Sequence, residues 1–204
     1  MLDERLRPWK DRIFDPAARW LGGRVHPHLI SAVGVLPGVA AAILAAYAEN
    51  GAALACWIVN RLLDGLDGVV SRMDGRQSDF GGYLDILLDY VAYAAIPVGL
   101  TLGNPSADKY VAGVLLLASF LVNAASWMYL AAILERRKLG ATATGERTTI
   151  TMPSGLIAGS ETIIFYSLFF LFPDRVPMLF SVMASMVGIT VIQRLVWAAR
   201  SIRP

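Results

Sequence analysis

The chain alternates long apolar segments with short polar connections, and the apolar segments take up most of its length. Each segment is close to the roughly 20 residues that an α-helix needs to cross the hydrocarbon core of a bilayer. The pattern therefore predicts an all-α, polytopic membrane protein with six transmembrane helices, at about Leu29–Ala48, Ala52–Arg72, Gly82–Leu102, Tyr110–Leu134, Gly155–Phe172 and Pro177–Ala198.

The segment before the first span is charged but carries a periodic apolar face. Trp9, Ile13, Ala17 and Trp20 recur at helical spacing, opposite basic residues. This pattern is typical of an amphipathic helix that lies in the membrane interface, although Pro16 interrupts it; a loose basic leader is the alternative. We therefore expect an N-terminal cytoplasmic or interfacial arm at residues 1–28 and a six-helix membrane domain at residues 29–204.

The composition agrees with a membrane protein. Hydrophobic residues make up 56% of the chain and charged residues 17%. Soluble domains carry about a quarter charged residues, so a soluble enzyme is excluded. The mean hydropathy of +0.54 points the same way.

The basic residues gather in alternate connections. By the positive-inside rule, this distribution places both termini and the second–third connection at the cytoplasmic face. The net charge of +2 thus reflects topology and contact with anionic lipid, and no feature indicates nucleic-acid binding. The residues are Arg5, Arg7, Lys10, Arg12, Arg19 and Arg24 in the arm, then Arg72, Arg76, Arg136, Arg137, Lys138, Arg147, Arg200 and Arg203.

Acidic residues lie within or beside the second and third predicted spans. A carboxylate in a bilayer costs at least a few kcal/mol, so such residues are functional candidates. On the second span, Asp67 lies about 60° around the helix from Asp64, and further polar or small residues lie within about 40° of Asp64. The third span carries a matching stripe at every fourth position, which a hairpin would bring opposite the first. The stripes are Asn60, Asp64, Asp67, Gly68 and Ser71, and Gly81, Asp85 and Asp89.

Four clustered carboxylates repel one another unless cations neutralise them. Hard oxygen ligands without a nearby Cys or His favour Mg²⁺ or Mn²⁺ over Zn²⁺. Phosphate-transfer sites commonly hold two such ions about 3.5–4 Å apart. The sequence therefore predicts a metal site at Asp64, Asp67, Asp85 and Asp89.

The same residues form one continuous pattern, Asp64-x₂-Asp67-Gly68-x₂-Ser71-Arg72-x₈-Gly81-x₃-Asp85-x₃-Asp89. It resembles the signature of the CDP-alcohol phosphotransferase (phosphatidyltransferase) family of phospholipid-synthesis enzymes. Every spacing agrees, and the one departure is Ser71, where the family usually has Ala. Outside the motif, the resemblance extends loosely to the whole chain.

The resemblance implies a reaction. A CDP-linked lipid, in the first instance CDP-diacylglycerol, would donate its phosphatidyl group to an alcohol and release CMP. Asp64, Asp67, Asp85 and Asp89 would hold two ions, and Asp89 would also take the proton from the acceptor hydroxyl. Gly68 and Gly81 would let the nucleotide approach the backbone beside Ser71, and Arg72 would contact phosphate.

The acceptor pocket is expected beside the aspartates, near the fourth–fifth connection. Arg147 is the preferred ligand for an acceptor phosphate, while Arg136 resembles a stop at the end of a helix. Glu161 either lines this pocket or is a structural partner for a neighbouring group. Glycerol 3-phosphate, inositol phosphate, serine and another phospholipid all remain open as acceptors.

The resemblance also implies a homodimer, which small-residue spacings such as Gly34-x₃-Gly38, Gly99-x₃-Gly103 and Gly155-x₃-Gly159 would permit. Two other functions are considered. A Mg²⁺-dependent membrane prenyltransferase has more spans and a different aspartate spacing. A cation transporter would use the carboxylates as a midplane relay, but these aspartates cluster towards one face.

Overall fold

The computed structural model describes residues 14–139 and 155–202, and these residues form helices without a β-strand. The all-α prediction is confirmed for this part of the chain. Residues 14–21 are helical, and the elements that follow are α2 (Pro27–Ala46), α3 (Asn50–Met73), α4 (Asp79–Gly103), α5 (Ala107–Arg136), α7 (Gly159–Leu171), a 3₁₀ turn η1 (Pro173–Arg175) and α8 (Val176–Ser201).

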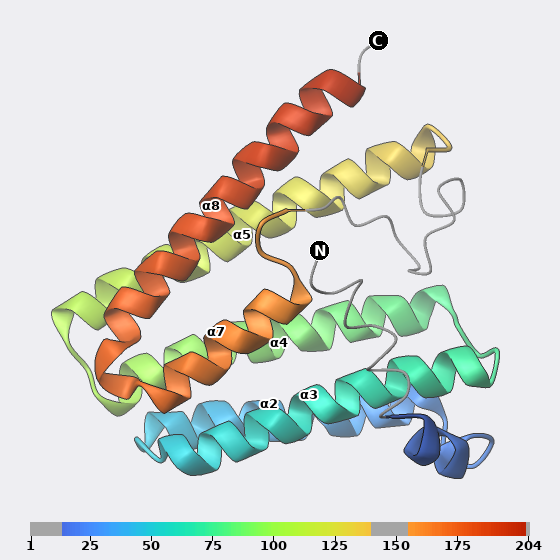
Figure 1. Ribbon diagram of the computed structural model, residues 1–204, viewed down its shortest axis with the longest axis horizontal. Coiled ribbons are helices and arrows are strands. Elements are labelled where there is room, and N and C mark those ends of the chain that lie inside the picture. Colours follow the sequence, from blue (N-terminus) through green and yellow to red (C-terminus); the bar gives the residue numbers. More distant parts are fainter. Residues whose placement is uncertain (1–13, 140–154, 203–204) are drawn as a thin grey trace.

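The helices form two groups joined by α7. Helix α2 packs along both α3 and α4, α5 packs along α8, and α7 contacts α3 and α8. Figure 1 shows the α2–α3, α4–α5 and α7–α8 connections gathered at one end of the molecule. The α3–α4 connection and the last turns of α5 and α8 lie towards the other end (Figure 1).

Helices α2 and α4 approach closely because glycines line their contact. A Cβ on Gly99 would overlap the carbonyl of Ala42, and a Cβ on Gly103 would overlap the carbonyl of Ala45. Only a residue without a side chain allows two backbones this close. The Gly99-x₃-Gly103 spacing therefore serves packing within one chain.

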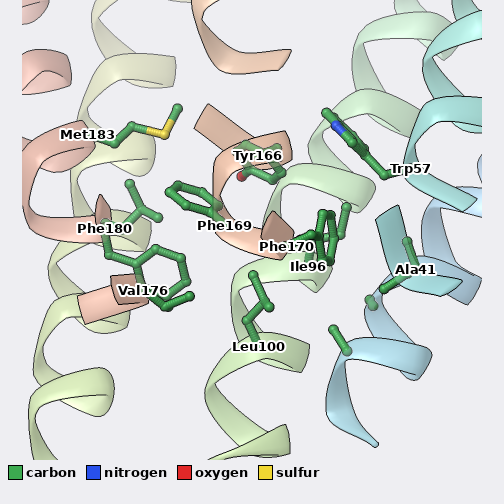
Figure 2. Close-up of a cluster of buried hydrophobic side chains, with 14 of the residues drawn as sticks. Ala41, Trp57, Ile96, Leu100, Tyr166, Phe169, Phe170, Val176, Phe180 and Met183 are labelled. Atoms are coloured by element: carbon green, nitrogen blue, oxygen red, sulfur yellow. The ribbon is translucent and has the colours of Figure 1, made fainter. Parts of the chain in front are cut away.

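An apolar cluster joins the two helix groups around α7 (Figure 2). The ring of Tyr166 stacks on Trp57 at 5.1 Å between ring centroids, and Phe169 meets Phe180 edge to face at 4.8 Å. These side chains are fully buried. The short helix α7 is thus held between α3 and α8.

A polar contact also fixes α8 against α5. Arg194 is buried, and its Nη1 donates hydrogen bonds to Asn123 Oδ1 at 2.9 Å and to Ser126 Oγ at 3.4 Å. An arginine buried in an apolar helix needs such acceptors. Arg194 also interacts electrostatically with Tyr90 of α4.

By length and composition, four helical segments of the described residues can cross a membrane: Pro27–Ala46, Asp79–Gly103, Ala107–Arg136 and Pro173–Ser201. Helix α3 spans 24 residues but carries Arg61, Asp64, Asp67 and Arg72, and α7 has 13 residues. The predicted span 155–172 therefore begins later than expected, at Gly159. The six-span arrangement stays a prediction.

The helix at residues 14–21 packs on the beginning of α2 and the end of α3. Ala18 is fully buried in a small cluster with Ile30, Leu66 and Val70. Beyond the helix, the Gly23 N–H donates to Asp74 Oδ2 at 2.9 Å. Pro16 does not break this helix, and the predicted contact of Trp9 with the membrane lies outside the described residues.

Candidate active site

One pocket lies between α2, α3 and α4, and all four predicted aspartates line it. Helix α2 packs on both α3 and α4, and the pocket brings together Asn60 and the four aspartates of the two predicted stripes. The other stripe residues, Gly68, Ser71 and Gly81, do not line it. The other lining residues are Ser31, Gly34, Val35, Arg61 and Leu88.

The beginning of α4 is fixed by a cap. Ser78 Oγ accepts a hydrogen bond from the Gly81 N–H at 3.1 Å, which satisfies a free donor of the first turn. The same oxygen lies 3.2 Å from His28 Nε2 of α2, with which it forms a hydrogen bond. A Cβ on Gly81 would lie 2.9 Å from His28 Nε2. Gly81 therefore lets α2 and α4 meet beside the pocket.

Each aspartate has its own neighbours. Asp67 is 5% exposed and accepts a hydrogen bond from the Ser31 hydroxyl. The carboxyl groups of Asp64 on α3 and Asp85 on α4 lie within hydrogen-bonding reach of each other, and such a bond needs a proton on one of them. Asp89 and Asp64 are more open than Asp67, with 26% and 24% of their side chains exposed. The four carboxylates are therefore not equivalent.

A buried arginine lies among them. Arg61 Nη2 donates to Asp89 Oδ1 at 2.7 Å, and Arg61 Nη1 lies 3.6 Å from Asp64 Oδ2. Its side chain is 8% exposed. Because carboxylates in an apolar setting need opposite charge, Arg61 offsets part of the repulsion within the cluster.

Arg61 was not predicted from the sequence as a site residue. It precedes Asp64 by three residues, which places it about 60° around α3 from Asp64 and on the polar stripe. A basic residue within an apolar helix is as costly as an acidic one. The same test that singled out the aspartates would therefore have found it.

The residues predicted to approach the nucleotide lie near the end of α3 and the beginning of α4. A Cβ on Gly68 would meet Arg72 Nη1 at 3.3 Å, so Gly68 and Arg72 are neighbours on α3. Ser71 and Arg72 are partly exposed in the last turns of this helix. Gly81 lies against His28, as described above.

The predicted acceptor residues are dispersed. Arg136 is exposed in the last turn of α5. Glu161 lies in the first turn of α7, where its Oε2 accepts a hydrogen bond from the Ala158 N–H at 3.2 Å. This bond favours the structural interpretation of Glu161. Arg147 lies outside the described residues.

The donor set of the pocket fits a hard cation such as Mg²⁺. Among residues 14–139 and 155–202, no three His, Cys, Asp or Glu side chains converge closely enough to hold one ion. Mg²⁺ keeps several water ligands and is usually held by one or two carboxylates, so such convergence is not required. The pairing of Arg61 with Asp89 also draws one carboxylate aside.

Known proteins resemble both the sequence and the fold. The sequence model of the CDP-alcohol phosphatidyltransferase family matches residues 24–196. The inner membrane protein YnjF of Escherichia coli (strain K12) is 34% identical over 174 residues, which cover 85% of this chain and 83% of YnjF. The archaetidylinositol phosphate synthase of Pyrococcus horikoshii is 44% identical over 46 residues, 22% of this chain and 24% of that protein.

The fold is that of the phosphatidylinositol phosphate synthase PgsA1 of Mycobacterium tuberculosis. The PgsA1 structure with CDP-DAG bound has a TM-score of 0.70 at 23% identity and covers 90% of this chain and 92% of PgsA1. The PgsA1 structure with manganese and citrate has a TM-score of 0.68 at 24% identity, and the match covers 90% of this chain and 88% of PgsA1.

The family match includes the whole of α2, α3, α4 and α5, and with them the pocket that the four aspartates line. The signature read from the sequence lies inside the same match. The chain thus belongs to the CDP-alcohol phosphatidyltransferase family of membrane transferases for phospholipid synthesis.

Proposed function

We propose that this protein transfers a phosphatidyl group, a substituted phosphate, from a CDP-alcohol to the hydroxyl of an acceptor alcohol and releases CMP. CDP-diacylglycerol is the proposed donor. The observation that carries the proposal is the pocket in which Asp64, Asp67, Asp85 and Asp89 meet. The structural likeness to PgsA1 with CDP-DAG bound supports the choice of donor. Membership of this family argues against the prenyltransferase and transporter alternatives.

The four aspartates are proposed to hold two Mg²⁺ ions, for which Mn²⁺ would substitute. The oxygen-rich pocket and the manganese in the PgsA1 structure support this proposal. When bound, such ions neutralise the diphosphate of the donor and the negative charge that grows on the departing CMP oxygen.

Asp89 is the proposed proton acceptor. Its carboxylate would take the proton from the acceptor hydroxyl, whose oxygen then attacks the lipid-side phosphorus as the bond to CMP breaks. Its exposure, greater than that of Asp67, is compatible with this role, because a base must reach the substrate. Asp67, which is nearly buried and bonded to Ser31, is better suited to hold a fixed geometry.

Gly68, Ser71, Arg72 and Gly81 are proposed to contact the donor nucleotide. No group other than Arg72 would crowd a Cβ on Gly68, so this side of α3 is open to a ligand. The Arg72 guanidinium beside it would bind a phosphate of the donor. Gly81 has a second, structural role, because its missing side chain accommodates His28.

The acceptor is proposed to bind next to Asp89, with Arg147 and Arg136 as phosphate ligands. Glu161 is included as a residue of the pocket wall, where its bond to the Ala158 N–H would hold the start of α7. Arg194 is an additional candidate, since this buried cation interacts electrostatically with Tyr90, the residue that follows Asp89 in the sequence. A buried guanidinium suits an anionic acceptor better than an uncharged one.

The membrane arrangement is proposed to have six spans, with α3 and α7 completing the set. Both termini and the aspartate pocket would lie on the cytoplasmic side, where nucleotides are available. The positive-inside distribution and the grouping of helix ends in Figure 1 support this orientation. The helix at residues 14–21 would lie along the same interface, and a homodimer is proposed on family resemblance.

Product analysis tests the proposed function. Purified protein would be incubated with Mg²⁺, CDP-diacylglycerol and each acceptor in turn: inositol phosphate, glycerol 3-phosphate, serine and phosphatidylglycerol. We expect one acceptor to yield a new phospholipid together with equimolar CMP. Inositol phosphate is the first to test, because two of the similar proteins are named as inositol phosphate lipid synthases. If the protein does not consume CDP-diacylglycerol with any of these acceptors, the proposal is overturned.

A further inference from the structure

Arg61 is held in one orientation from several sides. Its Nε and Nη2 donate to Asn60 Oδ1 at 3.0 and 2.8 Å, and its Nη1 donates to the Tyr93 hydroxyl at 3.0 Å. Its guanidinium carbon lies 4.7 Å from the centre of the Trp57 ring. This combination of hydrogen bonds and ring stacking leaves the planar group little freedom.

The support continues into the backbone of α2. Asn60 Nδ2 donates to the Gly34 carbonyl at 2.7 Å, and a Cβ on Gly38 would lie 3.0 Å from the same nitrogen. Asn60 is itself buried. The orientation of Arg61 is therefore set by the packing of α2 on α3.

Arg61 in turn fixes the orientation of the Asp89 carboxylate. It binds Oδ1 of Asp89 at 2.7 Å, while the Tyr93 hydroxyl donates to Oδ2 at 3.4 Å. Both oxygens of this carboxylate are thus directed by groups on α3 and α4. Among the described residues, Asp67 forms no ion pair with a basic side chain, and Asp64 lies farther from Arg61, at 3.6 Å.

We propose that Arg61 is a positioning residue, a built-in cation that orients Asp89 for proton transfer and weakens the binding of Asp89 to the divalent ions that the four aspartates share. The part of this proposal that concerns proton transfer rests on the proposed function. The part that concerns cation binding stands on the geometry alone, because a fixed positive charge next to Asp89 opposes the binding of a second cation at the same carboxylate.

The test separates charge from packing by measuring both turnover and Mn²⁺ binding. Arg61→Gln removes the charge, Arg61→Lys keeps it without the planar fork, and Tyr93→Phe removes one hydroxyl without changing any charge. Arg200→Gln, at an exposed position of α8, is the control. Each purified protein would be titrated with Mn²⁺ alone, followed by electron paramagnetic resonance, and then assayed for kcat and KM with CDP-diacylglycerol.

We expect Arg61→Gln to bind Mn²⁺ about tenfold more tightly, because a repelling charge is gone. We expect its kcat to fall about 100-fold, as for a misplaced catalytic group, with an almost unchanged KM for CDP-diacylglycerol. Arg61→Lys should restore the wild-type Mn²⁺ affinity and part of kcat. Tyr93→Phe should lower kcat severalfold and leave Mn²⁺ affinity unchanged.

In Arg61→Gln, the Mn²⁺ affinity should rise while kcat falls. A merely structural role of Arg61 would instead weaken metal binding and turnover together. Mn²⁺ binding by Arg61→Gln that is equal to or weaker than wild type would overturn the proposal. So would a kcat near wild type for the same variant. If Arg61→Gln does not fold, Tyr93→Phe with wild-type kcat overturns it. An inactive wild-type protein would instead refute the proposed function, and the Mn²⁺ titration would still decide the part that concerns cation binding.

Discussion

The aspartates of the pocket differ in the partner that each one has. Asp67 accepts a hydrogen bond from the Ser31 hydroxyl, Asp64 and Asp85 lie close to each other, and Asp89 pairs with an arginine. Carboxylates placed in different surroundings can take different roles in one reaction. We therefore expect substitutions at these positions to have different kinetic signatures, although all four belong to one motif.

The first prediction compares Asp89→Asn with Asp64→Asn. We expect Asp89→Asn to lower kcat by about 10²–10⁴-fold, the usual contribution of a general base, while donor binding partly survives. Asp64→Asn should weaken both donor binding and turnover, because it removes a cation ligand. Titration of CDP-diacylglycerol binding alongside kcat separates the two. Turnover at the wild-type rate in Asp89→Asn would show that the base is another group.

Helical spacing was enough to predict that the aspartates share a pocket, because residues three and four apart lie on one face. It was not enough to predict their partners. Arg194 and its acceptor Asn123 are separated by 71 residues, and the tyrosine that holds Arg61 lies on another helix. Periodicity identifies the polar face of a helix, but only tertiary packing decides which helix that face meets.

The helices place the pocket through their caps and close contacts. Ser78 begins α4 directly after the α3–α4 connection, so Asp85 lies within the first two turns of the helix. Glycines at Gly99 and Gly103 then hold α4 against α2 farther along. The sequence predicted these helices to within a few residues. It could not predict that α7 begins as late as Gly159, because the apolar run that starts at Gly155 does not show where the backbone turns.

The second prediction tests the α2–α4 contact. Gly99→Ala places a methyl group against the Ala42 carbonyl, and we expect it to destabilise the protein by about 1–3 kcal/mol, as overpacking does. Gly188→Ala is the matched control, since nothing lies within 4 Å of a Cβ at this position of α8. Its stability should be unchanged or slightly higher, because Ala favours helix over Gly.

Thermal unfolding in one detergent, followed by circular dichroism, measures both glycine variants. A Gly99→Ala protein as stable as the Gly188→Ala protein would contradict the close contact. If Gly99→Ala loses activity only in proportion to its loss of stability, the α2–α4 contact supports the fold and does not shape the pocket directly.

On the scale of the whole molecule, the connections divide between two ends (Figure 1). The pocket aspartates lie in the second half of α3 and the first half of α4, and therefore on the side of the α3–α4 connection. The basic residues of the described chain are more frequent towards this end, as the alternation along the sequence indicated. Charge patterning therefore predicts an orientation. It does not predict how α5 and α8 cross the other helices, which depends on the aromatic packing around α7.

The third prediction tests the orientation with single cysteines in a Cys56→Ala background. Gln77 lies in the α3–α4 connection and Asn104 in the α4–α5 connection, and both are exposed. In intact cells, a membrane-impermeant thiol reagent should label Asn104→Cys and not Gln77→Cys. Opening the cells should make Gln77→Cys reactive. Labelling of Gln77→Cys from outside intact cells would reverse the proposed topology.

The most direct test of the account is the metal dependence of CMP release from CDP-diacylglycerol by the purified protein, with the acceptor that supports the highest rate. We expect CMP release in Mg²⁺, its loss in EDTA, and its recovery when Mg²⁺ or Mn²⁺ is restored in excess. The reason is that without cations the clustered carboxylates repel the anionic diphosphate. Full turnover in the presence of chelator would contradict the account of the aspartate pocket as a metal-dependent transferase site.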